Sequence, residues 1–386
     1  MLARSVRYRP VPRLVALDIP WDEGFVRAVE DVWSAGDAIA PLDPRLPPPA
    51  ARELTRTLRP THVLTRGGEL VTLEGGLPTE PGDAVVVGTS GSTGAPKAVV
   101  MSRAAVKWAA ESTSRMLEVD PSSDTWLACI PLSHVGGLGV VSRSLITGTP
   151  VVVHPRFRAA DVAKAADRGV TLVSLVSAAL ARIDPSRFKK ILLGGAAPPA
   201  VTAPNVVTTY GLTETFGGVV YDGLPLDGVE VTIGDGELGL PGEVLVRGPT
   251  LLRCYREGTN PLLAGGWFAT GDHGEIGSDG RLRVSGRISE TINTGGEKVW
   301  PAAVERVIAV HPNIAGVAVC GRPDPEWGEK VVAFVELFDP ARPVKLEEIR
   351  TLVRERISAW AAPREVVVLG SIPRLASGKV ARNQLP

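Results

Sequence analysis

The alternation of short apolar runs with helix-compatible segments constrains the fold of this 386-residue sequence more than any other feature. Strand-like runs recur at 125–130, 150–154, 170–175, 190–193 and 205–208. The intervening segments can form helices, and strands that alternate with helices form parallel sheets covered by those helices. The sequence therefore predicts an α/β core built on a parallel sheet.

The regions on either side of this core have other patterns. Residues 84–87 form a β-branched run typical of a buried strand. Upstream and downstream of it, helices are predicted at 22–34, at 50–58 and from an N-cap at Ser102 to about 117. Beyond residue 221, short alternating strands are separated by Gly, Asp and Pro turns, at 228–233, 242–247 and 281–285. This second pattern indicates a distorted antiparallel β part attached to the parallel core.

The C-terminal segment after Arg287 has the order of a separate α+β domain. Helices are predicted at 301–310 and 346–358, and strands at 315–320, 331–337 and 365–369. About 100 residues are enough for a domain with its own core. We therefore expect a large N-terminal domain at 1–287, a hinge at 288–289 and a small mobile C-terminal domain at 290–386.

The amino-acid composition argues against several kinds of binding partner and several cellular locations. The 42 Lys and Arg residues balance the 42 Asp and Glu residues, which argues against binding nucleic acid or an anionic membrane through charge. Cys129, Cys254 and Cys320 lie far apart, which argues against a disulfide framework or a zinc site. The most apolar stretch, 170–181, is shorter than the ~20 residues of a membrane span. We expect a cytoplasmic protein with no membrane insertion.

A Gly/Ser/Thr-rich segment after the strand at 84–87 is the strongest local signal of a binding site. Its backbone N–H groups and hydroxyls are suited to wrap phosphate oxygens, and a lysine adds a point charge. The residues expected to bind phosphate are Thr89, Ser90, Gly91, Ser92, Thr93, Gly94 and Lys97. Ala95 and Pro96 separate the last glycine from the lysine, so the segment is not a Walker A loop. A generic run of this composition would as readily form a flexible hairpin loop.

Two further segments carry polar side chains in turn-rich surroundings. Tyr210 is suited to stack on a base, Thr213 to bond a phosphate and Glu214 to hold a magnesium ion. Asp272, in the turn-rich stretch 270–272, is suited to accept hydrogen bonds from a ribose diol. Taken alone, a solvated glutamate and an Asx turn are the better explanations of these residues.

Together these segments resemble the adenylate-forming superfamily of acyl- and aryl-CoA synthetases, luciferases and peptide-synthetase adenylation domains. The resemblance covers most of the chain. Its motifs occur in order, at 88–99, 131–134, 194–196, 210–215, 270–272, 286–287 and 373–379. Seven ordered motifs are difficult to explain by chance, and the resemblance implies the two-domain fold of that superfamily.

A narrower likeness is to the o-succinylbenzoate–CoA ligases of menaquinone biosynthesis. It is carried by residues 131–143, 192–198 and 293–301. This resemblance implies an AMP-forming acid–thiol ligase, in which the acid attacks the α-phosphorus of Mg-ATP and CoA then displaces AMP. The implied small-molecule partners are ATP, an aromatic dicarboxylic acid and CoA, with Mg²⁺ as the cofactor. A homodimer is left open.

The resemblance also implies roles in the nucleotide site. Lys379 bridges the substrate carboxylate and the α-phosphate, while Thr213 and Glu214 act in catalysis, with Glu214 on the metal. Beyond the phosphate loop, the implied ATP-binding residues are Gly194, Gly195, Ala196, Tyr210, Gly211, Asp272 and Arg287. Without the resemblance, Lys379 is better explained as part of a frayed C-terminal tail.

The acid pocket is expected around residues 134–143. An o-succinylbenzoate carboxylate that stays anionic in a partly dry pocket needs a cation, and arginine binds carboxylates well. Arg143 is the candidate, although a surface arginine in a helix salt bridge is the alternative. The other residues expected to line this pocket are His134, Gly136, Gly217 and Gly218.

The resemblance further implies domain rotation after adenylation. Ser289 is the expected pivot, although relatives usually carry Asp or Lys there, and Gly295 and Gly296 are expected at the CoA tunnel. The phosphate loop is reached by residue 88, which implies an abbreviated N-terminal part. The competing functions are ligation of a different carboxylic acid, loading of a carrier-protein thiol, and a non-catalytic adenylate-binding sensor.

Overall fold

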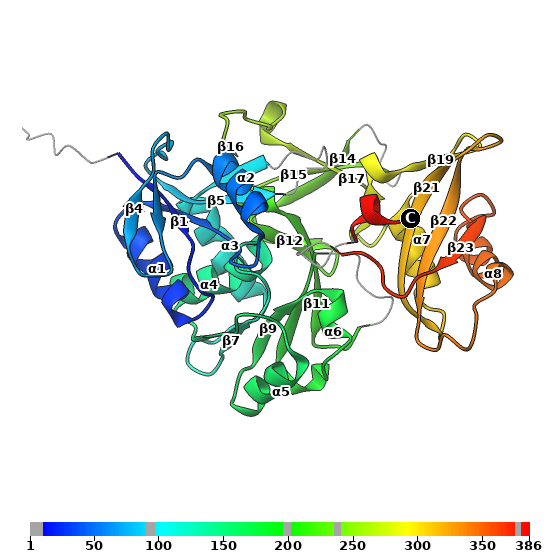
Figure 1. Ribbon diagram of the computed structural model, residues 1–386, viewed down its shortest axis with the longest axis horizontal. Coiled ribbons are helices and arrows are strands. Elements are labelled where there is room, and N and C mark those ends of the chain that lie inside the picture. Colours follow the sequence, from blue (N-terminus) through cyan, green and yellow to red (C-terminus); the bar gives the residue numbers. More distant parts are fainter. Residues whose placement is uncertain (1–10, 90–96, 196–201, 235–240, 375–379) are drawn as a thin grey trace, which may run out of the picture. The chain divides into compact units, whose positions relative to one another are not determined.

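The computed structural model describes residues 11–89, 97–195, 202–234, 241–374 and 380–386. They form two compact units (Figure 1). The first contains Met1–Ser174, Gly211–Val219 and Pro249–Pro261, and the second contains Leu175–Tyr210, Val220–Gly248 and Leu262–Pro386. The hinge that the sequence places at 288–289 stays a prediction.

A seven-stranded mixed sheet forms the centre of the first unit. Its strand order is β16-β6-β5-β2-β1-β3-β4. The strands are β1 (Leu14–Leu17), β2 (Ala38–Pro41), β3 (His62–Leu64), β4 (Leu70–Thr72), β5 (Asp83–Thr89), β6 (Lys97–Ser102) and β16 (Cys254–Tyr255). The strand predicted at 84–87 is confirmed as part of β5, which pairs antiparallel with β6. Strands β1 to β4 are three or four residues long, and the sequence analysis did not place them.

The helices predicted at 22–34, at 50–58 and from Ser102 are present within two residues of their expected starts, and two more helices lie among the segments that the sequence left as helix-compatible. They are α1 (Glu23–Ser34), α2 (Pro48–Leu58), α3 (Arg103–Met116), α4 (Val135–Thr147) and α5 (Ala159–Asp167). Asp22 caps α1 by accepting hydrogen bonds from the N–H groups of Gly24 and Phe25. Ser102 caps α3 in the same way, with its Oγ 3.1 Å from the N–H of Ala105.

The parallel strands predicted between residues 125 and 208 are present. In the first unit, β7 (Trp126–Ala128) pairs in parallel with β8 (Val151–Val153) and with the start of β9 (Leu172–Leu175). In the second unit, β10 (Lys190–Leu193) pairs in parallel with β11 (Val206–Leu212). The α/β part of the prediction is therefore confirmed.

The antiparallel part is confirmed as a four-stranded sheet of the second unit, in the order β14-β15-β17-β18. Its strands are β14 (Glu230–Gly234), β15 (Gly242–Arg247), β17 (Phe268–Ile276) and β18 (Leu282–Arg287). A short hairpin joins β12 (Gly217–Tyr221) to β13 (Leu224–Pro225), at one edge of the sheet that contains β10 and β11. The sequence suggested a turn-rich stretch at residues 270–272, but these residues lie inside strand β17. Strand β17 pairs on both edges and alternates buried with half-buried side chains, which overrides the local turn preference of Gly and Asp.

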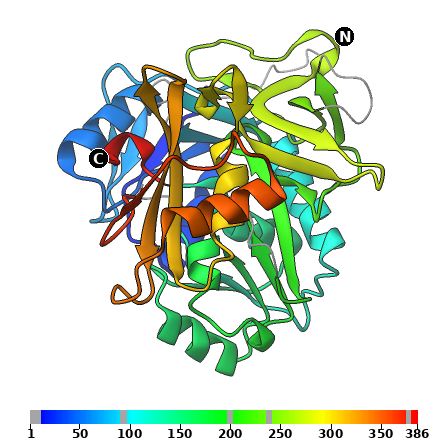
Figure 2. The same ribbon diagram turned by 90° about the vertical axis from the view of Figure 1, so that its right-hand side faces the viewer.

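The C-terminal part has the predicted α+β order. Its elements are β19 (Ile292–Thr294), β20 (Glu297–Val299), α7 (Pro301–Ile308), β21 (Ile314–Asp324), β22 (Gly328–Leu337), α8 (Leu346–Arg356) and β23 (Glu365–Val368). Figure 2 shows α8 crossing in front of the long strands β21 and β22. Val304 and Ile308 of α7 share an apolar core with Ile349 and Val353 of α8.

Short helices complete the described chain. They are α6 (Ser177–Leu180) and the 3₁₀ turns η1 (Pro185–Arg187), η2 (Thr213–Thr215), η3 (Ala264–Gly266), η4 (Ile288–Glu290) and η5 (Arg382–Gln384). Across the residues that the structure describes, no helix is both long and apolar enough to cross a membrane.

The three cysteines are free thiols. Cys129 follows β7 and is buried, and this burial raises the pKa of its thiol to about 12. Cys254 in β16 and Cys320 in β21 are partly exposed, and burial raises the pKa of each thiol to a smaller degree.

Candidate functional site

The strands that flank the predicted phosphate loop are paired up to their last residues. Thr89 ends β5 and lies opposite Lys97, which begins β6. An antiparallel pair of this kind fixes the two ends of the connecting segment at strand spacing. Ser90, Gly91, Ser92, Thr93 and Gly94 lie outside the described residues.

Lys97 and Glu214 are linked through a tyrosine that the sequence analysis did not single out. The Nζ atom of Lys97 lies 5.0 Å from the ring centroid of Tyr255. The hydroxyl of Tyr255 donates to Oε1 of Glu214 at 3.1 Å. Tyr255 belongs to β16, which pairs with β6 beside Lys97. A cation, an aromatic ring and a carboxylate therefore lie in one row within the first unit.

Glu214 and Thr213 lie on a tight turn held by buried contacts. The hydroxyl of Thr215 accepts from the N–H of Leu212 at 2.8 Å and donates to the carbonyl of Gly217 at 2.7 Å. Thr215 is fully buried, so this turn is fixed from inside. The fixed turn presents Thr213 and Glu214, which are half-buried, at the end of β11.

Gly211 is required by this turn. A Cβ atom at position 211 would lie 1.8 Å from the carbonyl oxygen of Gly217, which is far inside van der Waals contact. Gly217 itself has φ +103°, a backbone conformation that side chains disfavour. The two glycines are thus needed for the backbone shape that positions Glu214, whatever else they contact. Gly218 is half-buried in β12.

His134 lies immediately before α4, and Gly136 and Gly137 form its first turn. A Cβ atom on Gly137 would lie 2.3 Å from the carbonyl oxygen of Pro131, so the helix start packs directly on the preceding backbone. Gly136 has more room, since its nearest neighbour is Cδ1 of Ile130 at 3.3 Å. His134 is half-buried at this junction.

Arg143 is a buried cation, not the surface arginine that the sequence left open. The residue is only 8% exposed and lies on α4. Its guanidinium lies 4.4 Å from the ring centroid of Trp126 and donates to the Ser174 hydroxyl at 3.0 Å. A Cβ atom on Gly139 would lie 3.3 Å from a guanidinium nitrogen, so this glycine leaves room for the side chain. Burial of this cation in a polar and aromatic niche is costly unless it is well partnered.

In the second unit, two predicted residues bond the carboxylate of a third. Asp272 and Arg287 are cross-strand partners in β17 and β18, with Nε of Arg287 3.0 Å from Oδ1 of Asp272. The Tyr210 hydroxyl donates to the other oxygen, Oδ2, at 2.8 Å. Burial, and next the negative charge of Asp272, raise the pKa of the Tyr210 phenol, so the phenol remains a donor at neutral pH.

Thr270 sets the position of this cluster. Its hydroxyl accepts from the N–H of Asp272 at 3.1 Å, and its carbonyl accepts from Arg287 at 2.8 Å. The same hydroxyl donates to the carbonyl of Val244 at 2.7 Å, which ties the cluster to β15. The sequence analysis grouped Thr270 with Asp272 but gave it no role.

Gly194 and Gly195 follow β10 in the second unit. A Cβ atom on Gly194 would lie 2.6 Å from the hydroxyl oxygen of Thr209, and Gly195 has φ +82°. The backbone here is therefore close to β11 and free of side chains, as a planar ligand would need. Ala196 lies outside the described residues.

Gly295 and Gly296 form a two-residue hairpin turn between β19 and β20, with φ +61° and +86°. Positive φ at both positions is typical of a type I′ turn. The N–H of Gly295 donates to the carbonyl of Trp327 at 2.9 Å, and a Cβ atom at 295 would lie 2.7 Å from the Trp327 ring. Ser289 is exposed within η4.

Lys379 lies outside the described residues, but the chain on both sides of it is anchored. Arg374 and Val380 form an antiparallel bridge. Arg382 pairs with Glu305 of α7 at 2.6 Å and with Glu290 at 3.1 Å. The segment that carries Lys379 is therefore held at its two ends to the core of the C-terminal part.

The positions of the described carboxylates and histidines show which of them could bind a metal ion. Within the described ranges, no three His, Cys, Asp or Glu residues gather as a metal site. Magnesium bound together with nucleotide phosphates needs only one or two protein carboxylates. The half-buried Glu214 carboxylate, oriented by Tyr255, fits that requirement.

Family models match both parts of the chain. The model described as "AMP-binding enzyme" matches residues 76–256, and the model described as "AMP-binding enzyme C-terminal domain" matches residues 303–379. These matches define the class of protein as an AMP-binding enzyme.

The curated relatives define a narrower family than the family models do. The chain is 38% identical over 327 residues to a probable 2-succinylbenzoate–CoA ligase of Mycobacterium tuberculosis, covering 78% of this chain and 83% of that one. It is 34% identical over 335 residues to the 2-succinylbenzoate–CoA ligase of Bacillus subtilis, covering 78% and 68% of the two chains. The chain belongs to the 2-succinylbenzoate–CoA ligase family of AMP-binding enzymes.

Solved structures agree. The o-succinylbenzoate CoA synthetase of Bacillus subtilis in complex with the acyl-adenylate intermediate OSB-AMP has a TM-score of 0.83 at 28% identity, covering 96% of this chain and 87% of that one. The same enzyme in complex with ATP and magnesium ion has a TM-score of 0.82 at 29% identity, covering 97% and 89%. The adenylate-forming fold expected from the sequence is confirmed.

Proposed function

We propose that this protein is an ATP-dependent ligase that activates 2-succinylbenzoate as an acyl adenylate and transfers it to CoA. The products are 2-succinylbenzoyl-CoA, AMP and pyrophosphate. Family membership supports the reaction, and the buried cation Arg143, 8% exposed, is the observation that carries the choice of acid. ATP, CoA and the acid are the partners in this proposal, and the cytoplasm is its compartment.

The first half-reaction joins two anions. A carboxylate oxygen of the acid attacks the α-phosphorus of ATP, a phosphorus–oxygen bond forms, and pyrophosphate leaves. Carboxylates are ionised at pH 7, so this step needs no general base. Its barrier is lowered chiefly by positioning and by positive charge on the α-phosphate, which we assign to Lys379.

Nucleotide binding is assigned to the residues that the motifs single out. Lys97 supplies charge beside the phosphates, while Thr213 bonds an oxygen of the α-phosphate. Asp272, oriented by Tyr210 and Arg287, accepts hydrogen bonds from the ribose hydroxyls. The other groups assigned to ATP are the loop residues Thr89, Ser90, Gly91, Ser92, Thr93 and Gly94, and Gly194, Gly195, Ala196 and Gly211. A magnesium ion held by Glu214 and the phosphates neutralises charge on the triphosphate when bound.

Arg143 is assigned to the carboxylate of the acid that is not activated. A dicarboxylic acid buries a second negative charge, and this charge is costly without a cation near it. His134, Gly136, Gly217 and Gly218 complete the acid pocket in this proposal. In the second half-reaction, the CoA sulfur attacks the acyl carbon and AMP leaves, with Gly295 and Gly296 at the CoA tunnel.

A thioester assay with a panel of acids tests the proposal. The wild-type protein with ATP, Mg²⁺ and CoA is expected to use 2-succinylbenzoate at least 100-fold better, in kcat/KM, than benzoate or a fatty acid. Arg143→Ala should lower kcat/KM for 2-succinylbenzoate about 100-fold, the loss expected when a buried carboxylate loses its cation, and change that for benzoate little.

The controls separate the competing functions. Arg143→Lys keeps the charge and should recover part of the activity, whereas Lys379→Ala should abolish acid-dependent pyrophosphate release with every acid. An equal effect of Arg143→Ala on both acids would overturn the choice of substrate. Pyrophosphate release without CoA thioester would instead point to a carrier-protein thiol, and the absence of pyrophosphate release would point to a sensor.

A further inference from the structure

A cavity of about 390 Å³ lies in the first unit, between β8 and α5. It belongs to a part of the chain to which neither the motifs nor the proposed reaction assign a role. Its lining comes from the segment after β8, from one face of α5 and from the residues just after that helix. The cavity is large enough for a small organic ligand.

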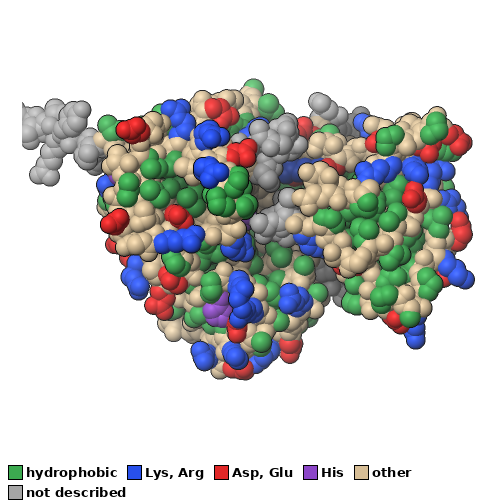
Figure 3. All heavy atoms as spheres, in the orientation of Figure 1, with side chains coloured by type: hydrophobic (Ala, Val, Ile, Leu, Met, Phe, Trp, Pro, Cys, Tyr) green, Lys and Arg blue, Asp and Glu red, His purple; other side chains and the backbone are tan. Residues whose placement is uncertain are grey.

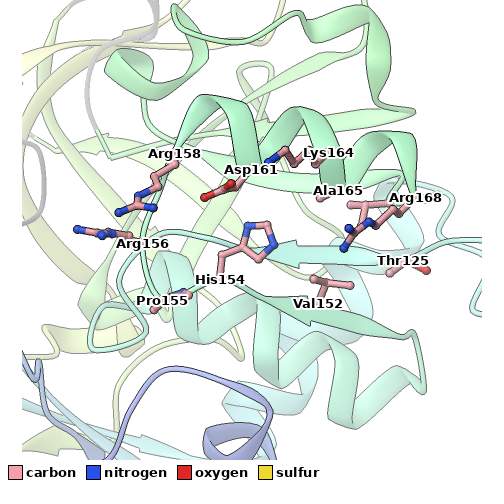
Figure 4. Close-up of a pocket in the computed structure, with 11 residues that line it drawn as sticks. Thr125, Val152, His154, Pro155, Arg156, Arg158, Asp161, Lys164, Ala165 and Arg168 are labelled. Atoms are coloured by element: carbon pink, nitrogen blue, oxygen red, sulfur yellow. The ribbon is translucent and has the colours of Figure 1, made fainter.

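Charged side chains around this cavity are predominantly cationic. Arg156 and Arg158 approach from the segment after β8, while Lys164 and Arg168 come from α5 and its C-terminal end. Asp161 is the one carboxylate in the lining. In Figure 4, Arg156 and Arg158 lie at one end of the pocket and Arg168 at the other, with His154 between them.

The cluster of cationic side chains is also visible on the surface of the molecule. In Figure 3, Lys and Arg side chains gather around a histidine over the region of α5. Arg156, Arg158, Lys164 and Arg168 are all exposed, so a ligand entering from solvent reaches them directly.

The four cations also lack the carboxylate partners that some arginines in the described chain possess. Arg253, for example, pairs with Asp83 and Glu80, and Arg247 pairs with Glu230. Within the described ranges, no ion pair or side-chain hydrogen bond joins any of the four pocket cations to a carboxylate. Like charges held together without counter-ions repel one another, and a bound anion would relieve this repulsion.

His154 adds a polar group to the cavity. Its Nδ1 atom is buried and has no hydrogen-bond partner among the residues that the structure describes. The side chain follows β8, whose backbone is fixed there by the His154 N–H bond to the carbonyl of Ala128 at 2.8 Å. A ligand with hydroxyl or phosphate oxygens would satisfy such a nitrogen.

Apolar residues form another part of the lining. Val152, Pro155, Ala165 and Val170 contribute carbon surface next to the cations. A site with several guanidinium groups beside an apolar wall suits a phosphorylated organic molecule better than a bare ion, because arginine forks bind phosphate oxygens in pairs.

We propose that the cavity between β8 and α5 is a binding site for phosphate-bearing small molecules, held by Arg156, Arg158, Lys164 and Arg168. The shared chemistry is a phosphate group with two negative charges. Two sources carry it in this setting: a nucleotide bisphosphate of the kind found in CoA, and free pyrophosphate or inorganic phosphate. Binding at this cavity does not depend on the proposed reaction.

Calorimetric titration of the full-length chain tests this site. The probes are adenosine 3′,5′-bisphosphate, pyrophosphate and inorganic phosphate, each titrated into the wild-type protein and into Arg158→Gln/Arg168→Gln. The double variant should lose one class of sites, with affinity at that class reduced at least tenfold, since each exposed ion pair contributes up to about 1 kcal/mol. The matched control is Arg52→Gln/Arg56→Gln on α2, whose arginines are equally exposed, and it should bind as the wild type does.

A second variant should change the affinity for phosphate in the opposite direction. Asp161→Asn removes the carboxylate from the lining and should tighten phosphate binding roughly threefold to tenfold, with a steeper loss of affinity at high salt. Misfolding cannot produce such a gain.

Relative affinity for the three probes distinguishes the sources. Tighter binding of the bisphosphate than of pyrophosphate identifies the nucleotide, and the reverse order identifies the free anions. Identical titrations of the wild type and Arg158→Gln/Arg168→Gln would overturn the proposal, even in a protein that forms the thioester normally. A protein that forms no thioester but loses a class of sites in the double variant would overturn only the proposed function.

Discussion

At the residue scale, Tyr255 has the most informative position of the residues that carry no motif. It lies 41 residues after Glu214 in the sequence, yet its hydroxyl bonds that carboxylate and its ring lies beneath Lys97. The contact exists because β16 adds to the edge of the sheet next to β6. A tyrosine in a turn-rich stretch gives no sequence signal of such a contact.

Substitution of Tyr255 tests whether this row of side chains matters for catalysis. Tyr255→Phe removes the donor to Glu214 but keeps the ring, and kcat should fall about tenfold with a higher Mg²⁺ requirement, because hydrogen bonds to charged groups contribute about 1.5–3 kcal/mol. Pyrophosphate release measured against Mg²⁺ concentration provides the readout.

Tyr255→Leu provides the matched comparison. This variant also removes the ring beneath Lys97, so KM for ATP should rise a further few-fold beyond the value for Tyr255→Phe. Unchanged kinetics in both variants would show that the contacts with Glu214 and Lys97 are structural only.

The motifs in the sequence named residues with reactive or ligand-binding groups but missed residues that only hold these groups in place. Asp272, Arg287 and Tyr210 were all expected to bind ATP, and the structure joins Arg287 and Tyr210 to the Asp272 carboxylate. Thr270 and Thr215, which hold their neighbours in place, carry no catalytic chemistry of their own. Sequence motifs therefore indicate which side chains are expected to carry the chemistry, whereas the contacts that support them depend on strand pairing that no single segment encodes.

At the scale of elements, agreement with the sequence follows the strength of local signals. Helices α1 and α3 have side-chain caps at Asp22 and Ser102, and both begin where they were expected. Strands β1 and β3 are only four and three residues long, and their existence depends on neighbours distant in sequence. Strand β17 was mistaken for a turn-rich stretch because Gly271 and Asp272 have low strand propensity.

The anchor formed by η5 makes a prediction about stability and pH. Arg382 pairs with Glu305, whose side chain is 18% exposed. Burial raises the pKa of the Glu305 carboxyl, although the charge of Arg382 opposes this effect. Arg382→Gln should lower the free energy of unfolding by about 2 kcal/mol at pH 7.5, between the values for exposed and buried pairs.

The pH dependence of this loss has a definite sign. A carboxyl with a raised folded-state pKa favours the native state below its unfolded pKa, and this contribution is lost as pH rises through the folded value. Removal of Arg382 raises the folded pKa further, so the destabilisation should shrink as the pH is lowered from 7.5 to 5. Urea unfolding at both pH values measures it.

Arg322→Gln is the control for this measurement. Arg322 donates to the carbonyl of Leu385 and to a backbone oxygen of Pro386, the last residue, so it also anchors the C-terminal segment. A C-terminal carboxyl titrates well below pH 5, so its ionisation does not change over the range measured. Its stability loss should not depend on pH. An Arg382→Gln loss that is equally large at pH 5 and 7.5 would contradict the electrostatic explanation.

At the scale of the whole molecule, we expect the C-terminal part to rotate about the proposed hinge at 288–289 between the two half-reactions. In the described conformation, side chains make contacts across it within the second unit. The rings of His273 and Trp300 stack at 4.0 Å, and Arg306 donates to the carbonyl of Val284 at 3.1 Å. Rotation at the proposed hinge would break both contacts.

Ser289→Pro tests the hinge. Proline fixes its own φ and restricts Ile288 before it, so rotation about these bonds should be impeded. We expect acid-dependent pyrophosphate release within about twofold of wild type and CoA thioester formation slowed at least tenfold. Single-turnover measurements of the two steps provide the comparison.

Ser289→Ala, which leaves the backbone free, should behave as the wild type in both steps. Equal slowing of both half-reactions in Ser289→Pro, or of neither, would exclude a pivot at this residue.

The burial of the cysteines has a practical consequence for every assay described above. The thiolate is the reactive form of a cysteine, and burial keeps the Cys129, Cys254 and Cys320 side chains protonated at neutral pH. A chromogenic disulfide reagent added to a reaction mixture should therefore report the disappearance of free CoA with little background from the enzyme. The protein itself thus permits continuous optical monitoring of its proposed second substrate.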